Sequence, residues 1–374
     1  MYRRLFVAGF LAVSLVASPS LAWHEVGHML TVLVAYKQLS PGDVPSEAVK
    51  RLVVILKHHP RYREDFASAM PSGLSEDGEA RWLLCRASVW PDQLRNDREN
   101  QPSFPPVADK QGSYHRGIWH YIDTPLLIVA EGTSSERTKA LEEKARTGQD
   151  LSTDIPSDEQ KVRNVVQAIA FNRQRFVHGS PAEKAVALCW LLHTLGDIHQ
   201  PLHGTAAFTA HVLNPLDHPH GDAGGNAIHL AQGRNLHALW DAAPDAAPDA
   251  SFDPHEPFDQ RYGRAYARAL KQIDPLLADV DLTEQGKRAA RECDPKQWTR
   301  ESFQLAQEKV YVAEIRKQIL AADQEQKPSD EELVVQLPDG YRERAHEIGK
   351  LRVVQGGWRT AEFLKSLDVL SGGK

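Results

Sequence analysis

One apolar segment in the middle of the chain places the strongest constraint on the fold. Ser180 is followed by proline and, three positions on, by Glu183, a pattern typical of a capped helix start. Residues 185–195 are apolar nearly all round, so this helix should be central and buried. His193 and Asp197 lie four residues apart near its end and share one face. Burying both groups is costly unless a partner offsets the cost, and a metal ion is such a partner.

The rest of the chain also has helical periodicity. Apolar residues recur at spacings of three and four, and the alternating runs of half-buried strands are scarce. No segment is long enough to separate two domains convincingly, so we expect an all-α fold with one multi-helix domain over residues 23–374. Besides the central segment, we expect helices over 44–57, 159–177, 303–322 and 342–367, and surface loops over 96–112, 205–224 and 242–257.

The first 22 residues have the pattern of a signal peptide. Arg3 and Arg4 precede an apolar run over 5–17 that is too short to span a bilayer comfortably. Small residues precede a cleavage site after Ala22, so the mature chain should begin at Trp23 and be secreted or exported to the periplasm. An uncleaved membrane anchor is the alternative.

The charge balance limits how a polyanion can be bound. The chain has 44 Lys and Arg against 50 Asp and Glu, so its formal net charge is −6. No basic excess is available to hold a nucleic-acid backbone with side chains alone. A phosphate-rich substrate would therefore need another source of positive charge, such as metal ions. The three cysteines form no C-x-x-C pair, so we expect buried apolar thiols rather than zinc ligands.

A second histidine–aspartate pair strengthens the metal hypothesis. His237 and Asp241 repeat the four-residue spacing, and His203 follows the proline that ends the central helix. One such pair is more often a structural helix cap, but two in one chain favour a metal site. Further candidates are Asp92 and Arg95 in W-P-D-Q-L-R, and His120 and Tyr121 in W-H-Y-I-D.

The segment from His24 to His28 matches H-E-x-x-H, the signature of zinc proteases. Such a protease needs the motif on a helix inside a folded domain, whereas here it begins one residue after the expected mature terminus. A different use fits better. A free α-amino group has a pKa of about 8 and can lose its proton to zinc. The amino nitrogen and carbonyl oxygen of Trp23 can chelate one ion, with His28 as a third contact.

Taken in order, these motifs resemble the single-strand-specific zinc-dependent nuclease and 3′-nucleotidase family, which is related to the bacterial zinc-dependent phospholipases C. The similarity runs from Trp23 to Asp241, and a weaker similarity is found in G-G-W-R at 356–359. The shared motifs are W-P-D-x-x-R, W-H-Y-I-D-x-P, H-x-x-G-D-x-H-Q-P-L-H, D-x-G-G-N and N-L-H-x-x-W-D.

The resemblance implies a mostly helical domain with three Zn²⁺ ions at the base of a cleft. Asp197 would bridge the first two ions, while His24, Glu25 and His199 would be structural. By position, the first zinc would be held by Asp92, His120, His193 and Asp197, the second by Trp23, His28 and Asp197, and the third by His203, His237 and Asp241.

The resemblance also implies an activity, the hydrolysis of single-stranded DNA and RNA to 5′-phosphorylated products, with 3′-nucleotidase activity. Water between the paired zincs would attack phosphorus, and the third zinc would take the leaving 3′-oxygen. Asp92 would orient the water, and Arg95 would bind a phosphate oxygen. Tyr121 would stack on a base or else pack in the core. We also expect the protein to be a monomer with no membrane-spanning segment.

Two alternatives stay open, a zinc-dependent phospholipase C and a zinc-binding protein without activity. Asp241, where the lipases favour glutamate, argues against the first, and Arg95 argues against the second. The chain also departs from the family in two long segments that should border the cleft. One precedes His120, and the other covers 205–222 and brings His211, His218 and His220, which we expect to be solvated loop residues rather than a surface metal site.

Overall fold

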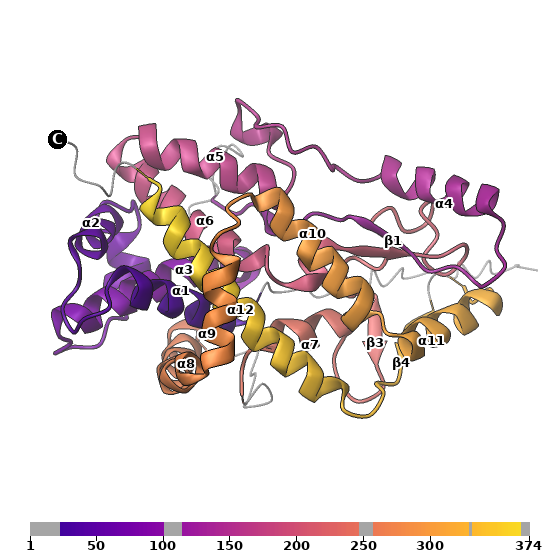
Figure 1. The fold of residues 1–374 in the computed structure, drawn as a ribbon. Coiled ribbons are helices and arrows are strands. Elements are labelled where there is room, and N and C mark those ends of the chain that lie inside the picture. Colours follow the sequence, from indigo (N-terminus) through magenta and orange to yellow (C-terminus); the bar gives the residue numbers. More distant parts are fainter. Residues whose placement is uncertain (1–22, 101–113, 247–256, 329–330, 368–374) are drawn as a thin grey trace, which may run out of the picture.

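The computed structural model describes residues 23–100, 114–246, 257–328 and 331–367, with side chains omitted at 95–100 and 258. Its fold is mainly helical, as expected (Figure 1). The elements are α1 (Glu25–Leu39), α2 (Glu47–Leu56), η1 (Tyr62–Ala67), α3 (Glu76–Asn100), η2 (Gly117–His120), β1 (Pro125–Leu127), α4 (Ser135–Thr147), η3 (Glu159–Lys161), α5 (Val165–His178), α6 (Pro181–Asp197), η4 (Pro201–Gly204), β2 (Ala206–Phe208), β3 (Ile228–Leu230), α7 (Leu236–Ala242), α8 (Phe258–Ala278), α9 (Val280–Ala289), α10 (Pro295–Leu305), η5 (Ala306–Val310), α11 (Ala313–Gln324), β4 (Leu333–Val335) and α12 (Tyr341–Lys365).

The central apolar segment forms α6, and its start is capped as the sequence predicts. The Ser180 side chain accepts from the Glu183 backbone N–H, and the Glu183 carboxylate accepts from the Ser180 backbone N–H at 2.9 Å. Every residue from Ala187 to Asp197 is buried, because α3 and α5 both pack against this helix. The end of α6 is therefore held rigidly inside the core.

A second helix pair, α1 and α12, ties the beginning of the described chain to its end. Gly357 of α12 lies against α1 so closely that an added Cβ would come within 2.4 Å of the Val34 Cβ. Glycine at this position lets the two backbones approach. The G-G-W-R motif at 356–359 thus contributes to a packing contact between helices. The helix α12, yellow in Figure 1, crosses the molecule beside α1 and α9.

Two short parallel strand pairs are features that the sequence patterns do not predict. β1 pairs with β2, and β3 pairs with β4, each over three residues. Three residues are too few to display an alternating pattern. Both pairs lie on the side of the molecule away from α2 (Figure 1). They fix the segments that follow η2 and precede α7.

Three expectations need correction. The helix expected over 303–322 is broken, because α10 passes into the wide turn η5 and the chain bends at Tyr311 before α11. The loop expected at 96–112 begins later, since α3 continues to Asn100, and residues 101–113 lie outside the described part. Cys85 and Cys189 are buried as expected, but Cys293 is exposed.

The loop expected over 205–224 contains the short strand β2. Of the loop expected over 242–257, residues 247–256 lie outside the described part of the chain. Among the residues that are described, no helix combines the length and the apolar character needed to cross a bilayer.

Candidate metal centre

Three groups of histidine and aspartate side chains converge in the interior. Within each group, the potential ligand atoms lie within 4.8 Å of one another, and every residue is buried. None of the eight side chains involved belongs to a residue more than 7% exposed. The groups are His28, His193 and Asp197; Asp92, His120 and His193; and His203, His237 and Asp241.

These residues come from six elements that are distant in the sequence. α1 carries His28, α3 carries Asp92 directly after Pro91 within the helix, and η2 carries His120. The last two turns of α6 carry His193 and Asp197, while η4 carries His203 and α7 carries the last pair. The centre therefore forms only when the helices have packed.

The Asp197 carboxylate lies between the first two groups. Its Oδ1 is 3.4 Å from His28 Nε2, while its Oδ2 is 3.0 Å from His120 Nδ1 and 3.1 Å from His193 Nε2. One carboxylate thus presents an oxygen to each group. Carboxylate oxygens are ligands that Zn²⁺ accepts, so Asp197 could offer one oxygen to each of two neighbouring ions.

Three histidines are oriented by backbone carbonyl groups. The Nδ1–H of His193 donates to Ser88 O at 2.6 Å, that of His203 to His120 O at 2.8 Å, and that of His237 to Gly224 O at 2.6 Å. A carbonyl oxygen can only accept, so each ring carries its proton on Nδ1 and presents the Nε2 lone pair to its group. Metal-binding histidines are commonly held in this way.

The third group has additional support from its neighbours. The Nε2 atoms of His203 and His237 lie 3.2 Å apart, and Gln200 donates its side-chain N–H to Asp241 Oδ1 at 2.8 Å. Gly224 has a φ of +64°, and an added Cβ would come within 2.7 Å of the Leu202 carbonyl oxygen. The D-x-G-G-N motif therefore provides the tight turn whose carbonyl orients His237.

Electrostatics at this centre favours positive charge. Burial alone would lower the pKa of His193, but the nearby carboxylates of Asp197 and Asp92 outweigh that effect and raise it. Buried carboxylates are stabilised by a compensating positive charge, which a bound metal ion can supply. Nitrogen and oxygen donors at this spacing suit a divalent metal ion, so the residues present fit the zinc ions that the sequence motifs imply.

The other predicted site residues are Trp23, Tyr121 and Arg95. Trp23 is fully buried, and its indole N–H donates to Gly196 O at 2.9 Å, so Trp23 lies next to the residue that precedes Asp197. Gly196 leaves room for His28, since an added Cβ would lie 3.0 Å from the His28 Nδ1. Tyr121 is partly buried next to His120. Arg95 belongs to α3, but its side chain lies outside the described residues.

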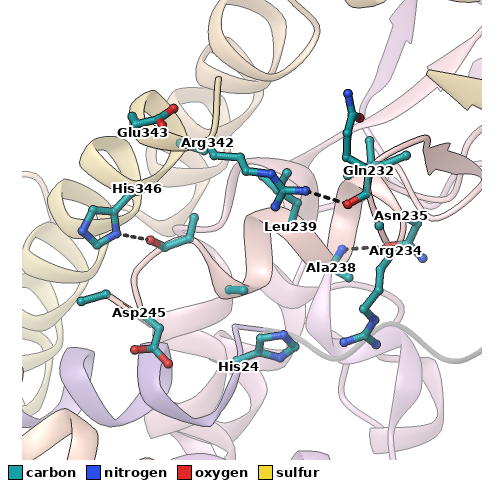
Figure 2. Close-up of a pocket in the computed structure, with 16 residues that line it drawn as sticks. His24, Gln232, Arg234, Asn235, Ala238, Leu239, Asp245, Arg342, Glu343 and His346 are labelled. Carbon is teal, nitrogen blue, oxygen red and sulfur yellow. Dashed lines mark hydrogen bonds between the residues drawn. The ribbon is translucent and has the colours of Figure 1, made fainter. Parts of the chain in front are cut away.

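The H-E-x-x-H motif is divided between different surroundings. His28 joins the ligand groups, whereas His24 lines a cavity of about 360 Å³ (Figure 2). Glu25 forms an ion pair with Arg261 at 2.6 Å. The cavity lies on the face of α7 that carries Ala238 and Leu239, away from the ligand pair of that helix. A protease-type site is therefore absent from the described residues.

Other motif residues have structural or supporting places. His199 accepts a hydrogen bond from Arg359 Nη1 at 3.1 Å, as expected of a structural residue, and Trp119 and Trp240 are buried. Sequence reasoning missed Gln200 and Asp123. Both residues belong to motifs that are visible in the sequence. Neither Gln200 nor Asp123, however, lies four residues from a histidine in the way that singled out the candidate ligands.

Comparison with known proteins places this geometry in context. The S1/P1 nuclease family profile matches residues 23–368. Endonuclease 1 of Arabidopsis thaliana is 27% identical over 249 residues, which cover 64% of this chain and 59% of that protein. The chain thus spans about three fifths of the length of this curated relative.

Proposed function

The chain belongs to the S1/P1 nuclease family, and from this premise we propose that it is a zinc-dependent phosphodiesterase acting on nucleic acids. Its substrates would be single-stranded DNA and RNA, cut to 5′-phosphorylated products, and 3′-nucleotides. The observation that carries the proposal is the convergence of three buried histidine–aspartate groups, two of which share His193. The similarity to a plant endonuclease supports the nucleic-acid substrate.

The proposed ligands divide among three ions. Asp197 belongs to the first two sets, and its two oxygens face different histidines, which supports a closely spaced pair. The first set is Asp92, His120, His193 and Asp197; the second is Trp23, His28 and Asp197; the third is His203, His237 and Asp241. Zinc held there supplies Lewis acidity and makes a water-derived nucleophile available near neutral pH.

The protein's own residues would set the geometry of the reaction. Asp197 fixes the spacing of the first two sets, because α6 is rigid and fully buried where it carries this residue. Asp92, the most exposed of these proposed ligands at 7%, would orient the reacting water. Arg95 would bind a phosphate oxygen, and Tyr121 would support a base, both by their places in the motifs.

The second set depends on a free chain terminus at Trp23. We propose that a signal peptide is removed after Ala22 and that the mature protein is secreted or periplasmic. The burial of Trp23 supports this, as does the hydrogen bond from His24 N–H to Asp241 O at 3.0 Å, which brings this part of the chain to the ligand groups. A retained leader would leave no free amino group to bind metal.

The first test uses the mature protein beginning at Trp23. Single-stranded DNA is incubated with the protein as purified, after chelation, and after zinc is restored, and the ends of the products are mapped. The proposal expects cleavage that is lost with chelation, regained with zinc, and leaves 5′-phosphate ends. Hydrolysis of phosphatidylcholine without hydrolysis of DNA would instead assign the centre to a phospholipase.

A second test examines the terminus. A protein with one extra residue before Trp23 should lose zinc from the second set and lose activity, because the amino group moves away. Full zinc content and full activity of the extended protein would show that the terminus is not a ligand.

A further inference from the structure

A histidine of the long loop after η4 lies against a buried carboxylate beside the ligand groups. His220 Nδ1 is 3.5 Å from Asp123 Oδ2, and the side chain of His220 is 62% exposed while that of Asp123 is 8% exposed. Neither residue belongs to the three ligand groups. His211 and His218 of the same loop join no metal-binding group among the described residues either.

The position of His220 is fixed by the residues on both sides of it. The carbonyl of Pro219 accepts from the Gln149 side chain at 2.5 Å, and the Asp222 N–H donates to Ala207 O at 2.9 Å. Gly221 between them has a φ of +55°, and an added Cβ would lie 2.3 Å from the Ala207 carbonyl oxygen. The loop is therefore packed tightly at this point, and the imidazole is held over Asp123 by the backbone.

Asp123 connects this loop to the proposed reaction centre. It lies three positions after His120, in the segment between η2 and β1, and its side chain is buried. An isolated carboxylate here would repel an anionic substrate. His220 offsets that charge, and the hydrogen bond to Asp123 raises the pKa of His220, which favours its protonated form.

The orientation of the imidazole indicates what it can bind. Because Nδ1 faces the carboxylate, Nε2–H points the other way, and the side chain is largely exposed. A protonated imidazole with one N–H on a carboxylate offers the other to an anionic oxygen. We propose that His220 binds a backbone phosphate of the nucleic-acid strand next to the one being cleaved, with Asp123 as its positioning residue. This inference rests on the proposed function.

The main experiment measures binding as a function of salt. A phosphorothioate oligothymidine that resists cleavage is titrated with the zinc-loaded protein at pH 6 over a series of NaCl concentrations. Each phosphate contact contributes about 0.7 to the slope of log K against log salt for a single strand. His220→Ala should lower that slope by about 0.7, and His220→Lys should restore it.

Two controls separate a direct contact from a structural effect. His211→Ala removes an exposed histidine from the same loop and should leave the slope unchanged. Removing His220 alone leaves Asp123 buried without this partner, so the double variant with Asp123→Asn is measured as well. It should be as stable as the wild type and still have the lower slope.

Kinetics provide an independent test. His220→Ala should raise KM for an oligonucleotide but not for a 3′-mononucleotide, which brings only the phosphate being cleaved. Equal salt slopes for His220→Ala and the wild type, an equal loss in His211→Ala, or no measurable strand binding by the wild type would overturn the inference. Binding with a normal slope change but no hydrolysis would instead overturn the proposed function alone.

Discussion

Replacing Gln200 by alanine tests how the third ligand group is supported. Gln200 is fully buried, donates to Asp241 Oδ1 at 2.8 Å, and accepts from the Leu202 N–H. A hydrogen bond to a charged group contributes about 1.5–3 kcal/mol and a neutral one about 0.5–1.5 kcal/mol. Gln200→Ala should therefore lower the free energy of unfolding of the metal-free protein by about 3 kcal/mol.

The same substitution should also weaken metal binding. Loss of a residue that orients a ligand commonly reduces metal affinity about 10–100-fold. We expect a reduction of this size for the ion proposed at His203, His237 and Asp241, with metal at the other two proposed sets retained. Zinc titration of the chelated protein, followed by metal analysis after gel filtration, measures the effect.

Gln304→Ala is the matched control for Gln200→Ala. Gln304 is exposed and donates to Glu308 Oε1 at 3.0 Å on the surface of the molecule. Its loss should change stability by no more than about 0.5 kcal/mol. If urea unfolding gives the same midpoint for both variants and zinc affinity is unchanged in both, the argument that Gln200 holds Asp241 is refuted.

Three further predictions concern packing, pH and metal. Gly357→Ala should destabilise the protein by about 1–3 kcal/mol because the added Cβ meets α1, whereas Gly263→Ala, with no atom within 4 Å of an added Cβ, should stabilise it by up to about 1 kcal/mol in thermal unfolding. Burial raises the pKa of Asp222 to about 6, so the native state keeps this proton to higher pH than the unfolded chain; the stability of the metal-free protein relative to Asp222→Asn should fall as the pH rises from about 4 to 6 and then level off. Asp197→Asn should lose two of three zinc ions and nearly all hydrolysis, and metal analysis that finds three ions would contradict the bridge.

The sequence predicted the central helix and its cap because both depend on local rules. The polar and apolar pattern of α6 and the Ser180–Glu183 cap involve neighbours along the chain. The ligand pairs at four-residue spacing were visible for the same reason. Their convergence in three groups was expected from the family resemblance, since spacing alone does not say which helices meet.

Other features depend on contacts between distant residues and could not be predicted locally. The break at Tyr311 occurs where its hydroxyl donates to Asp222 across the fold, although the apolar periodicity continues through 303–322. The pairing of His220 with Asp123 requires the turn at Gly221 and the strand pair β1–β2. Long loops provide no periodicity from which such a contact could be inferred.

The contact between the Trp23 indole and Gly196 joins positions 173 residues apart. Closing a segment of that length slows folding, because chain entropy is lost before the contact contributes any stability. His28 and Asp197 span nearly the same segment, so these two residues meet only when that closure is complete, whereas Asp197 and His193 are neighbours on α6. A metal ion held by both His28 and Asp197, as proposed, would bind only after that closure, so the rate of refolding would limit the rate of metal loading.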